Sequence, residues 1–156
     1  MTHPKPNAGH PHEGRLRLYA QDAEDLSVIS ATLQDAVLTI ADMAFLPRRR
    51  RFALVLNRFR WERLADGSRR KTAERVRTGL HFDGVLKAGM RNLKRDMPDA
   101  VLSLLTLAHE AGPDGMATIG LVFSGDGGIR LSAECIDVVM EDLSDPWPAR
   151  GVPSHS

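Results

Sequence analysis

Hydrophobic and polar residues alternate along much of this chain. The clearest alternation covers residues 75–88, where Leu80 and Phe82 stand between small or polar neighbours. A period of two predicts a β-strand with one buried face and one face that mostly meets water. The shorter run RLRLYA, residues 15–20, alternates in the same way and predicts another strand.

Two segments carry the period of an α-helix instead. In residues 23–34 the hydrophobic residues fall on one face, and Asp22 is placed to accept hydrogen bonds from the free amides of the first turn. The second segment is ECIDVVMEDL, residues 134–143. Four of its hydrophobic residues have the spacing of a helix face: Ile136, Val139, Met140 and Leu143. We expect this second helix to close one end of a sheet, and Pro146 to end it.

Two pairs of hydrophobic runs are joined by short polar connections, which is typical of β-hairpins. The runs AVLTIADMAFL and RFALVLNRFRW, residues 36–46 and 51–61, are separated by PRRR. The runs ATIGLVF and IRLSAE, residues 117–123 and 129–134, flank SGDGG. The glycines of this second connection supply the positive φ angles that a tight turn needs.

Residues 100–110, AVLSLLTLAHE, fit a strand or a helix by period alone, and we favour a strand because Gly112 and Pro113 follow closely. The resulting order has many hairpins and no βαβ alternation. It predicts an α+β fold with a curved, mostly antiparallel sheet or partly open barrel of about seven strands. One helix follows the first strand, and a C-terminal helix closes the sheet. The strand count is also that of a pleckstrin-homology-like barrel, an analogy that implies no ligand.

The composition fits one domain with loose ends. The chain has 156 residues, of which 42% are hydrophobic. Residues 1–14 and 148–156 have little to bury and are predicted to be disordered tails, which leaves 15–147 as a single domain. Cys135 is the only cysteine, so no intramolecular disulfide can form. With no apolar run long enough for a signal peptide or membrane span, we expect a cytoplasmic protein with no membrane partner.

A net charge of +1 hides an uneven distribution of charge. Residues 47–77 contain 12 basic and three acidic residues, so this basic segment carries +9, and the rest of the chain carries −8. Such a division can attract an anionic partner, or it can be neutralised by the protein's own acidic surface. Both outcomes stay open at the level of sequence.

The basic segment is the candidate binding surface. We expect its arginine run to lie at an exposed hairpin tip, because Pro47 cannot donate to a sheet and four successive cations cannot all be buried. The predicted binding residues are Arg48, Arg49, Arg50, Arg51, Arg58, Arg60, Arg69, Arg70 and Lys71. An acidic protein surface is the favoured partner. Nucleic acid is the alternative, although alternation places the strand arginines on the face opposite Phe59 and Trp61, which disfavours a stacking surface.

An enzyme is the alternative class of function. His81 could serve as a base that Asp83 orients, and Cys135 lies where the second predicted helix begins, a position that favours thiol reactivity. No spacing shows that these three residues meet, and a buried, inert Cys135 fits the neighbouring Ile136 better. The sequence contains no metal-binding, cofactor-binding or nucleophile motif, so we predict no metal, no cofactor and no catalytic residue.

Four stretches resemble a known family in their residues and in their order along the chain: LYAQDAEDLSVISATLQDAV, FLPRRRRFALVLNRFRWE, RRKTAERVRTGLHFDGVL and IRLSAECIDVVMEDL. They resemble an uncharacterised bacterial family, domain of unknown function 2948, over about residues 15–147. The resemblance implies a single-domain bacterial protein. It implies no activity, ligand or catalytic residue, so the function we favour is a small non-enzymatic binding or interaction module.

Overall fold

The computed structural model describes residues 15–60 and 74–148. This part contains one α-helix, α1 (Ala23–Thr32), and eleven strands that join into one sheet. The strands are β1 (Arg17–Ala20), β2 (Val37–Thr39), β3 (Met43–Leu46), β4 (Arg51–Phe59), β5 (Glu74–Asp83), β6 (Val85–Arg91), β7 (Val101–Ala111), β8 (Ala117–Phe123), β9 (Gly128–Ala133), β10 (Val138–Asp142) and β11 (Trp147–Pro148).

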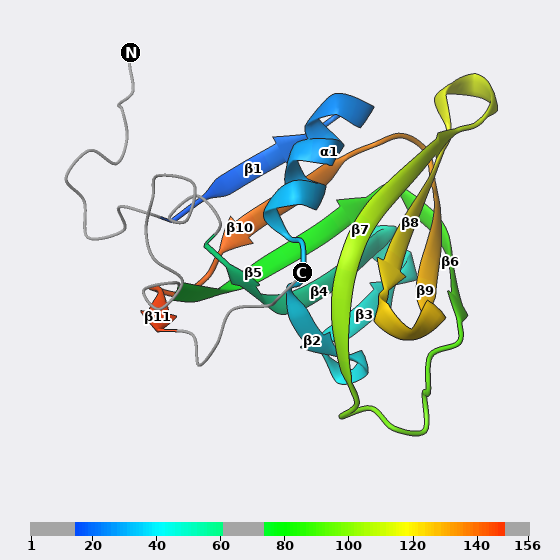
Figure 1. The fold of residues 1–156 in the computed structure, drawn as a ribbon. Helices are drawn as coiled ribbons and strands as arrows, with labels where there is room; N and C mark the ends of the chain where they lie inside the picture. The colour runs from blue at the N-terminus through cyan, green and yellow to red at the C-terminus, as the bar shows by residue number, and fades with distance from the viewer. Residues whose placement is uncertain (1–14, 61–73, 149–156) are drawn as a thin grey trace, which may run out of the picture.

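The sheet is antiparallel and curls on itself (Figure 1). The strand order is β1-β10-β5-β4-β2-β7-β8-β9-β6, with β3 added beside β4 and β11 beside β5. The chain passes from the first half of the sheet to the second between β5 and β6. Gly84 makes this corner with a φ of 74°, a left-handed conformation that favours glycine. The sheet stays open, because β1 and β6 are its two ends and do not pair.

Helix α1 confirms the first predicted helix and its start. The Asp22 carboxylate accepts a hydrogen bond from the backbone amide of Asp25 at 2.8 Å, as expected for an N-cap. The hydrophobic face, Leu26, Ile29 and Leu33, is buried. The helix packs against β1 and β7, so it covers the inside of the curl between the two halves of the sheet (Figure 1).

The alternation predicted for residues 75–88 is confirmed as far as the corner. Four inward residues of β5 are buried: Val76, Thr78, Leu80 and Phe82. Directly beyond Gly84, Val85 is buried and Leu86 is 45% exposed, and a register irregularity between Val85 and Lys87 then returns the even-numbered residues Ala88 and Met90 to the inside. The glycine corner therefore produces two strands from one alternating run.

The predicted hairpins are confirmed as β3–β4 and β8–β9, and β7 confirms that residues 100–110 are a strand. The run before the first hairpin is divided into β2 and β3 by a single 3-10 turn, η1 (Ile40–Asp42). The Asp42 carboxylate holds this turn, because it accepts hydrogen bonds from the Thr39 amide at 2.9 Å and the Thr39 hydroxyl at 3.1 Å. Asp42 therefore ends β2 by capping rather than by breaking the hydrophobic pattern.

The prediction of a C-terminal closing helix is wrong. The segment forms β10, which pairs with β1 on one side and β5 on the other. Val138 and Met140 point into the core, while Val139 lies on the outer face between Tyr19 and His81 and is only 8% exposed. Three successive residues are thus buried because the strand is covered on both faces. Ile136, Val139 and Met140 are therefore all buried at the spacing of a helix face, although Leu143, the fourth predicted position, is 50% exposed.

The predicted number of about seven strands is also wrong. Four of the eleven, β1, β2, β3 and β11, have four residues or fewer, and no helix follows β10 within residues 74–148. The analogy with a pleckstrin-homology-like barrel therefore fails. The two predicted tails lie outside the described residues, except Pro148, which pairs with Glu74 in β5. None of the helical structure described is long and apolar enough to cross a bilayer.

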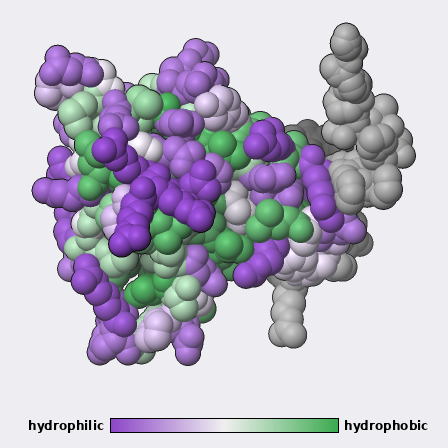
Figure 2. Space-filling view, turned by 180° about the vertical axis from the view of Figure 1, so that it is seen from behind, coloured by the Kyte–Doolittle hydropathy of each residue, from purple (hydrophilic) through white to green (hydrophobic). Residues whose placement is uncertain are grey.

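The hydrophobic core fills the inside of the curl. Phe52 and Phe82 pack there with ring centroids 6.5 Å apart, and Phe123 from the other half of the sheet belongs to the same cluster. At the rim of this core, residues such as Met43 and Met90 are only partly buried. On the outside, hydrophobic residues are interspersed with hydrophilic ones, as Figure 2 shows for the side turned away from the viewer of Figure 1.

Candidate functional site

The tip of the β3–β4 hairpin holds the predicted arginine run. The 3-10 turn η2, Pro47–Arg49, and the following Arg50 are exposed, as predicted, whereas Arg51 is already the first residue of β4 and is only partly exposed. However, Arg50 donates a hydrogen bond to the Glu134 carboxylate at 2.7 Å, and Arg51 donates one to the Asp83 carboxylate at 2.7 Å. Two of the four arginines therefore already have an acidic partner within the protein.

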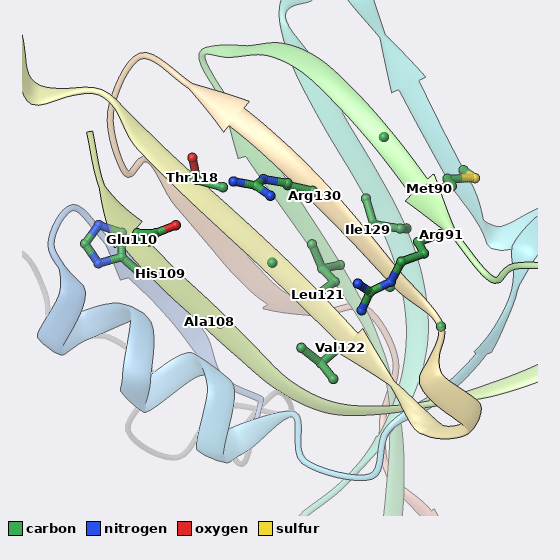
Figure 3. A pocket seen from close by; sticks show the side chains of 14 residues that line it. Met90, Arg91, Ala108, His109, Glu110, Thr118, Leu121, Val122, Ile129 and Arg130 are labelled. Carbon is green, nitrogen blue, oxygen red and sulfur yellow. The ribbon is translucent and has the colours of Figure 1, made fainter. Parts of the chain in front are cut away.

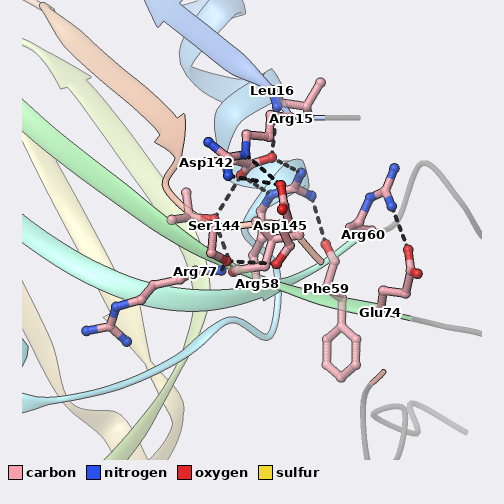
Figure 4. Close-up of polar contacts among 12 residues, drawn as sticks. Arg15, Leu16, Arg58, Phe59, Arg60, Glu74, Arg77, Asp142, Ser144 and Asp145 are labelled. Carbon is pink, nitrogen blue, oxygen red and sulfur yellow. Dashed lines mark hydrogen bonds and ion pairs between the residues drawn. The ribbon is translucent and has the colours of Figure 1, made fainter. Parts of the chain in front are cut away.

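Arg58, a predicted binding residue, lies in the interior with a side chain that is 0% exposed. Its Nη2 and Nε donate to the two carboxylate oxygens of Asp142 at 2.7 and 2.8 Å, and its Nη1 donates to the Phe59 carbonyl at 3.0 Å. Asp142 also accepts from the Thr78 hydroxyl at 2.9 Å and the Leu16 amide at 2.8 Å. This network joins β4, β5, β10 and the start of β1 (Figure 4), so Arg58 stabilises the fold and does not face a partner.

Other arginines of the basic segment are also engaged. Arg60 donates to the Glu74 carboxylate. The Arg75 guanidinium lies 3.9 Å from the ring centroid of Phe59, and desolvation lowers the pKa of Arg75. Phe59 is itself fully buried, so it offers no ring on which a base could stack. The remaining predicted binding residues, Arg69, Arg70 and Lys71, lie outside the described part of the chain, as does Trp61.

Much of the positive charge described in residues 47–77 is thus neutralised by the protein's own acidic side chains. Arg48, Arg49 and Arg77 are exposed and have no ion pair with any described residue. Arg48 and Arg49 lie at the hairpin tip, whereas Arg77 lies near the opposite end of β5, beside Asn57. These three cations therefore do not form one surface.

The residues of the enzyme alternative are brought together only in part. His81 Nδ1 lies 3.4 Å from a carboxylate oxygen of Asp83 on the outer face of β5, but the other oxygen accepts a hydrogen bond from Arg51. Cys135 is exposed in the connection between β9 and β10, so the prediction of a buried thiol at a helix start is wrong. Among the described residues, no group of three or more acidic, histidine or cysteine side chains is arranged to hold a metal ion.

A groove of about 630 Å³ lies on the outer face of β6, β9, β8 and β7 (Figure 3). The strand register aligns outward residues in rows across these four strands. The middle row runs from Gly89 in β6 through Arg130 in β9 and Gly120 in β8 to Ala108 in β7. Arg130 therefore stands between two glycines, and neither neighbouring strand offers a side chain beside it.

The two glycines leave space that a side chain would otherwise fill. A Cβ atom added at Gly89 would meet no atom within 4 Å, and one at Gly120 would meet only the Ala108 Cβ, at the ordinary contact distance of 3.8 Å. Neither residue has the positive φ that would require glycine. Their effect is therefore to expose the backbone as the floor of the groove.

Three cations project from this outer face: Lys87 and Arg91 from β6 and Arg130 from β9. All three are exposed. Figure 3 shows Arg91 and Arg130 extending over the strands toward β8, with Thr118 and Glu110 on the far side. Within residues 15–60 and 74–148, none of the three forms an ion pair with an acidic side chain. The site presents guanidinium groups over bare backbone, which suits carboxylate or phosphate oxygens.

Sequence reasoning missed this groove because its residues come from strands that meet only in the folded sheet. Arg91 and Arg130 are far apart in the chain, and the pairing of β6 with β9 brings them to one face. One signal was present: Lys87, Gly89 and Arg91 occupy alternate positions, and alternate residues of a strand share a face.

The family described as "Protein of unknown function (DUF2948)" matches residues 16–155. The chain belongs to this family. The resemblance of the four stretches is thereby confirmed. No curated protein and no solved structure matches the chain. The family brings no activity with it, so the groove and its charges are the features of this DUF2948 chain that bear on function.

Proposed function

We propose that this protein is a small, non-enzymatic, cytoplasmic binding module that holds an acidic segment of a partner protein in the groove over β6, β9 and β8. The observation that carries the proposal is the pair Arg91 and Arg130. Both are exposed above a glycine floor, and neither has an ion pair in the part of the chain that the structure describes. The single cysteine supports a reducing compartment.

Carboxylates match this site because a guanidinium group donates two parallel hydrogen bonds to one carboxylate. The protein already uses this chemistry internally, where Arg58 holds both oxygens of Asp142. In the groove, the guanidinium groups of Arg91 and Arg130 have no such acceptor among the described residues. A glutamate or aspartate side chain that enters the groove would supply the acceptor.

The shape of the groove favours a chain segment over a small molecule. Small-molecule sites bury about 70–90% of the ligand surface, whereas this groove lies open along the outer face of a sheet. Among the described residues that line it, His109 is the one aromatic ring, and there is no phenylalanine, tyrosine or tryptophan to form a run of stacking rings for nucleic-acid bases. Both observations support an acidic protein segment as the partner.

The test uses a fluorescein-labelled hexaglutamate peptide as the probe and measures its anisotropy with the full chain over a salt series. We expect binding at low salt that weakens as salt rises, because exposed ion pairs are screened. Arg91→Ser and Arg130→Ser should each weaken binding. Arg49→Ser is the matched control, since it removes an exposed arginine outside the groove.

Two results would overturn the proposal. One is the absence of hexaglutamate binding at low salt, or binding that Arg91→Ser and Arg130→Ser leave unchanged. The other comes from a labelled single-stranded DNA oligonucleotide of equal charge. If this oligonucleotide binds more tightly than hexaglutamate and loses affinity in the same two variants, the groove takes nucleic acid rather than an acidic protein segment.

A further inference from the structure

Strand β6 ends the sheet and offers an open edge beside the groove. It pairs with β9 from Val85 to Arg91. On its other side, Val85 donates its backbone amide to the Arg50 carbonyl at 2.8 Å, and no described strand pairs with the residues that follow. An unpaired edge of this kind is a template on which another strand can form main-chain hydrogen bonds.

The two faces of β6 differ in chemistry. Lys87, Gly89 and Arg91 point to the groove face, while Ala88 and Met90 point inward and are partly buried against the hydrophobic core. Figure 3 shows Met90 directed away from the groove. A strand laid along this edge would therefore meet cations on one face and the apolar rim of the core on the other.

The other end of the sheet differs. Strand β1 has four residues, α1 packs against it, and its outward Arg17 lies 3.8 Å from the Glu141 carboxylate of the neighbouring strand. The seven residues of β6 contain no proline, and both of its outward cations lack an ion pair within the described chain. Strand β6 thus has both an edge of backbone groups without a described strand partner and two cations without a described ion pair.

We propose that the acidic partner binds as an added β-strand along the open edge of β6, with alternating acidic and apolar side chains. This inference rests on the proposed function and names its binding mode. Acidic residues of the added strand lie beside Lys87 and Arg91 on the groove face, and its apolar residues extend the core past Ala88 and Met90. A second copy of the chain fits poorly, because antiparallel pairing of two β6 strands about Gly89 places Lys87 opposite Arg91.

The first experiment compares two peptides of equal composition by anisotropy: one alternates glutamate and valine, and the other has the same residues in two blocks. We expect the alternating peptide to bind roughly tenfold more tightly, the effect of a few cross-strand pairs. Hydrogen exchange of the full chain should show that the backbone amides of residues 86–91 that face away from β9 become protected. Equal affinities without that protection would overturn the added strand and leave groove binding intact. If neither peptide nor hexaglutamate binds, both proposals fail.

The second experiment uses Ala88→Pro and Gly89→Pro. Adjacent amides point to opposite edges of a strand, so one substitution removes a hydrogen bond to β9 and the other removes only an outward donor. The variant that keeps the wild-type melting temperature should lose its preference for the alternating peptide. If it retains that preference, the added strand is wrong.

A third measurement covers the case in which both proline variants unfold, and it uses the wild-type chain. Two alternating peptides are N-methylated at every second position, in the two possible registers. We expect only the register that methylates the donors facing β6 to lose affinity. Equal affinity of both methylated peptides would overturn the proposal. So would a free protein that sediments as a dimer in which the amides of residues 86–91 that face away from β9 are already protected.

Discussion

The hairpin around β4 and the groove over β6 and β9 are both rich in arginine, yet they use it in opposite ways. In the hairpin region Arg50, Arg51 and Arg58 each donate to a carboxylate at 2.7 Å. In the groove Arg91 and Arg130 have no ion pair among the described residues. The comparison teaches that local charge in the sequence does not locate a binding surface. The charge that the fold leaves unpaired does.

The largest expected effect tests the paired region. Arg58→Met should reduce the free energy of unfolding by about 3–5 kcal/mol, because it leaves the Asp142 carboxylate buried without its cation. Urea unfolding monitored by circular dichroism measures the loss. Arg49→Ser, at the exposed hairpin tip, is the control and should change stability by less than about 0.5 kcal/mol. A loss below about 1 kcal/mol for Arg58→Met would show that the pair is not important for the fold.

The next effect tests the unpaired region. The double variant Arg91→Ser, Arg130→Ser should weaken binding of the acidic peptide by roughly 30-fold, at about 1 kcal/mol for each guanidinium. Its melting temperature should stay near that of the wild type, since neither side chain has an ion pair in the described structure to lose. Calorimetric titration and thermal unfolding separate the two readouts. If the double variant binds the peptide normally but has a lower melting temperature, Arg91 and Arg130 stabilise the fold and do not bind the partner.

A smaller effect is expected when the groove is filled without a change of charge. Gly89→Val should reduce peptide affinity about tenfold by placing a side chain on the open floor. Stability should rise slightly, by about 0.5 kcal/mol, because valine suits a strand better than glycine and its Cβ meets no atom within 4 Å. The same titration measures the affinity. Unchanged affinity would place the peptide away from the floor of the groove.

The smallest effect concerns the exposed pairs of the hairpin. The side chains of the Arg50–Glu134 pair are 57% and 49% exposed, and those of Arg51–Asp83 are 36% and 27% exposed. Arg50→Gln with Arg51→Gln should therefore cost less than about 1 kcal/mol of stability. Peptide affinity at moderate salt should not change. A loss as large as that of the groove double variant would return the binding surface to the hairpin.

The parts of the fold that could be predicted from sequence are those in which local pattern and environment agree. Helix α1 has a capping aspartate at Asp22 and one hydrophobic face, and β5 has a single buried face. The final strand could not be recognised in this way. Because Val139 is covered on the outer face of β10, the buried positions lose their period of two.

For the candidate site, the sequence could predict the individual strands but not the surface that they form together. Arg58 lies on the inward face of β4 with Leu54 and Leu56, so period two could have indicated a buried arginine. Its partner Asp142 lies on β10, whose buried positions hide the strand, so the pair itself could not be predicted. The meeting of Arg91 with Arg130 depends on the register between β6 and β9. That register is a long-range property that neither strand specifies by itself.

The central claim is that an acidic partner binds the groove and not the basic segment 47–77. The most direct measurement is an NMR titration of the isotope-labelled chain with hexaglutamate, which follows each backbone amide. The account predicts that the largest shifts lie in β6, β8 and β9, around Gly89, Gly120 and Arg130. The largest shifts within residues 47–77, with the groove amides unmoved, would contradict it.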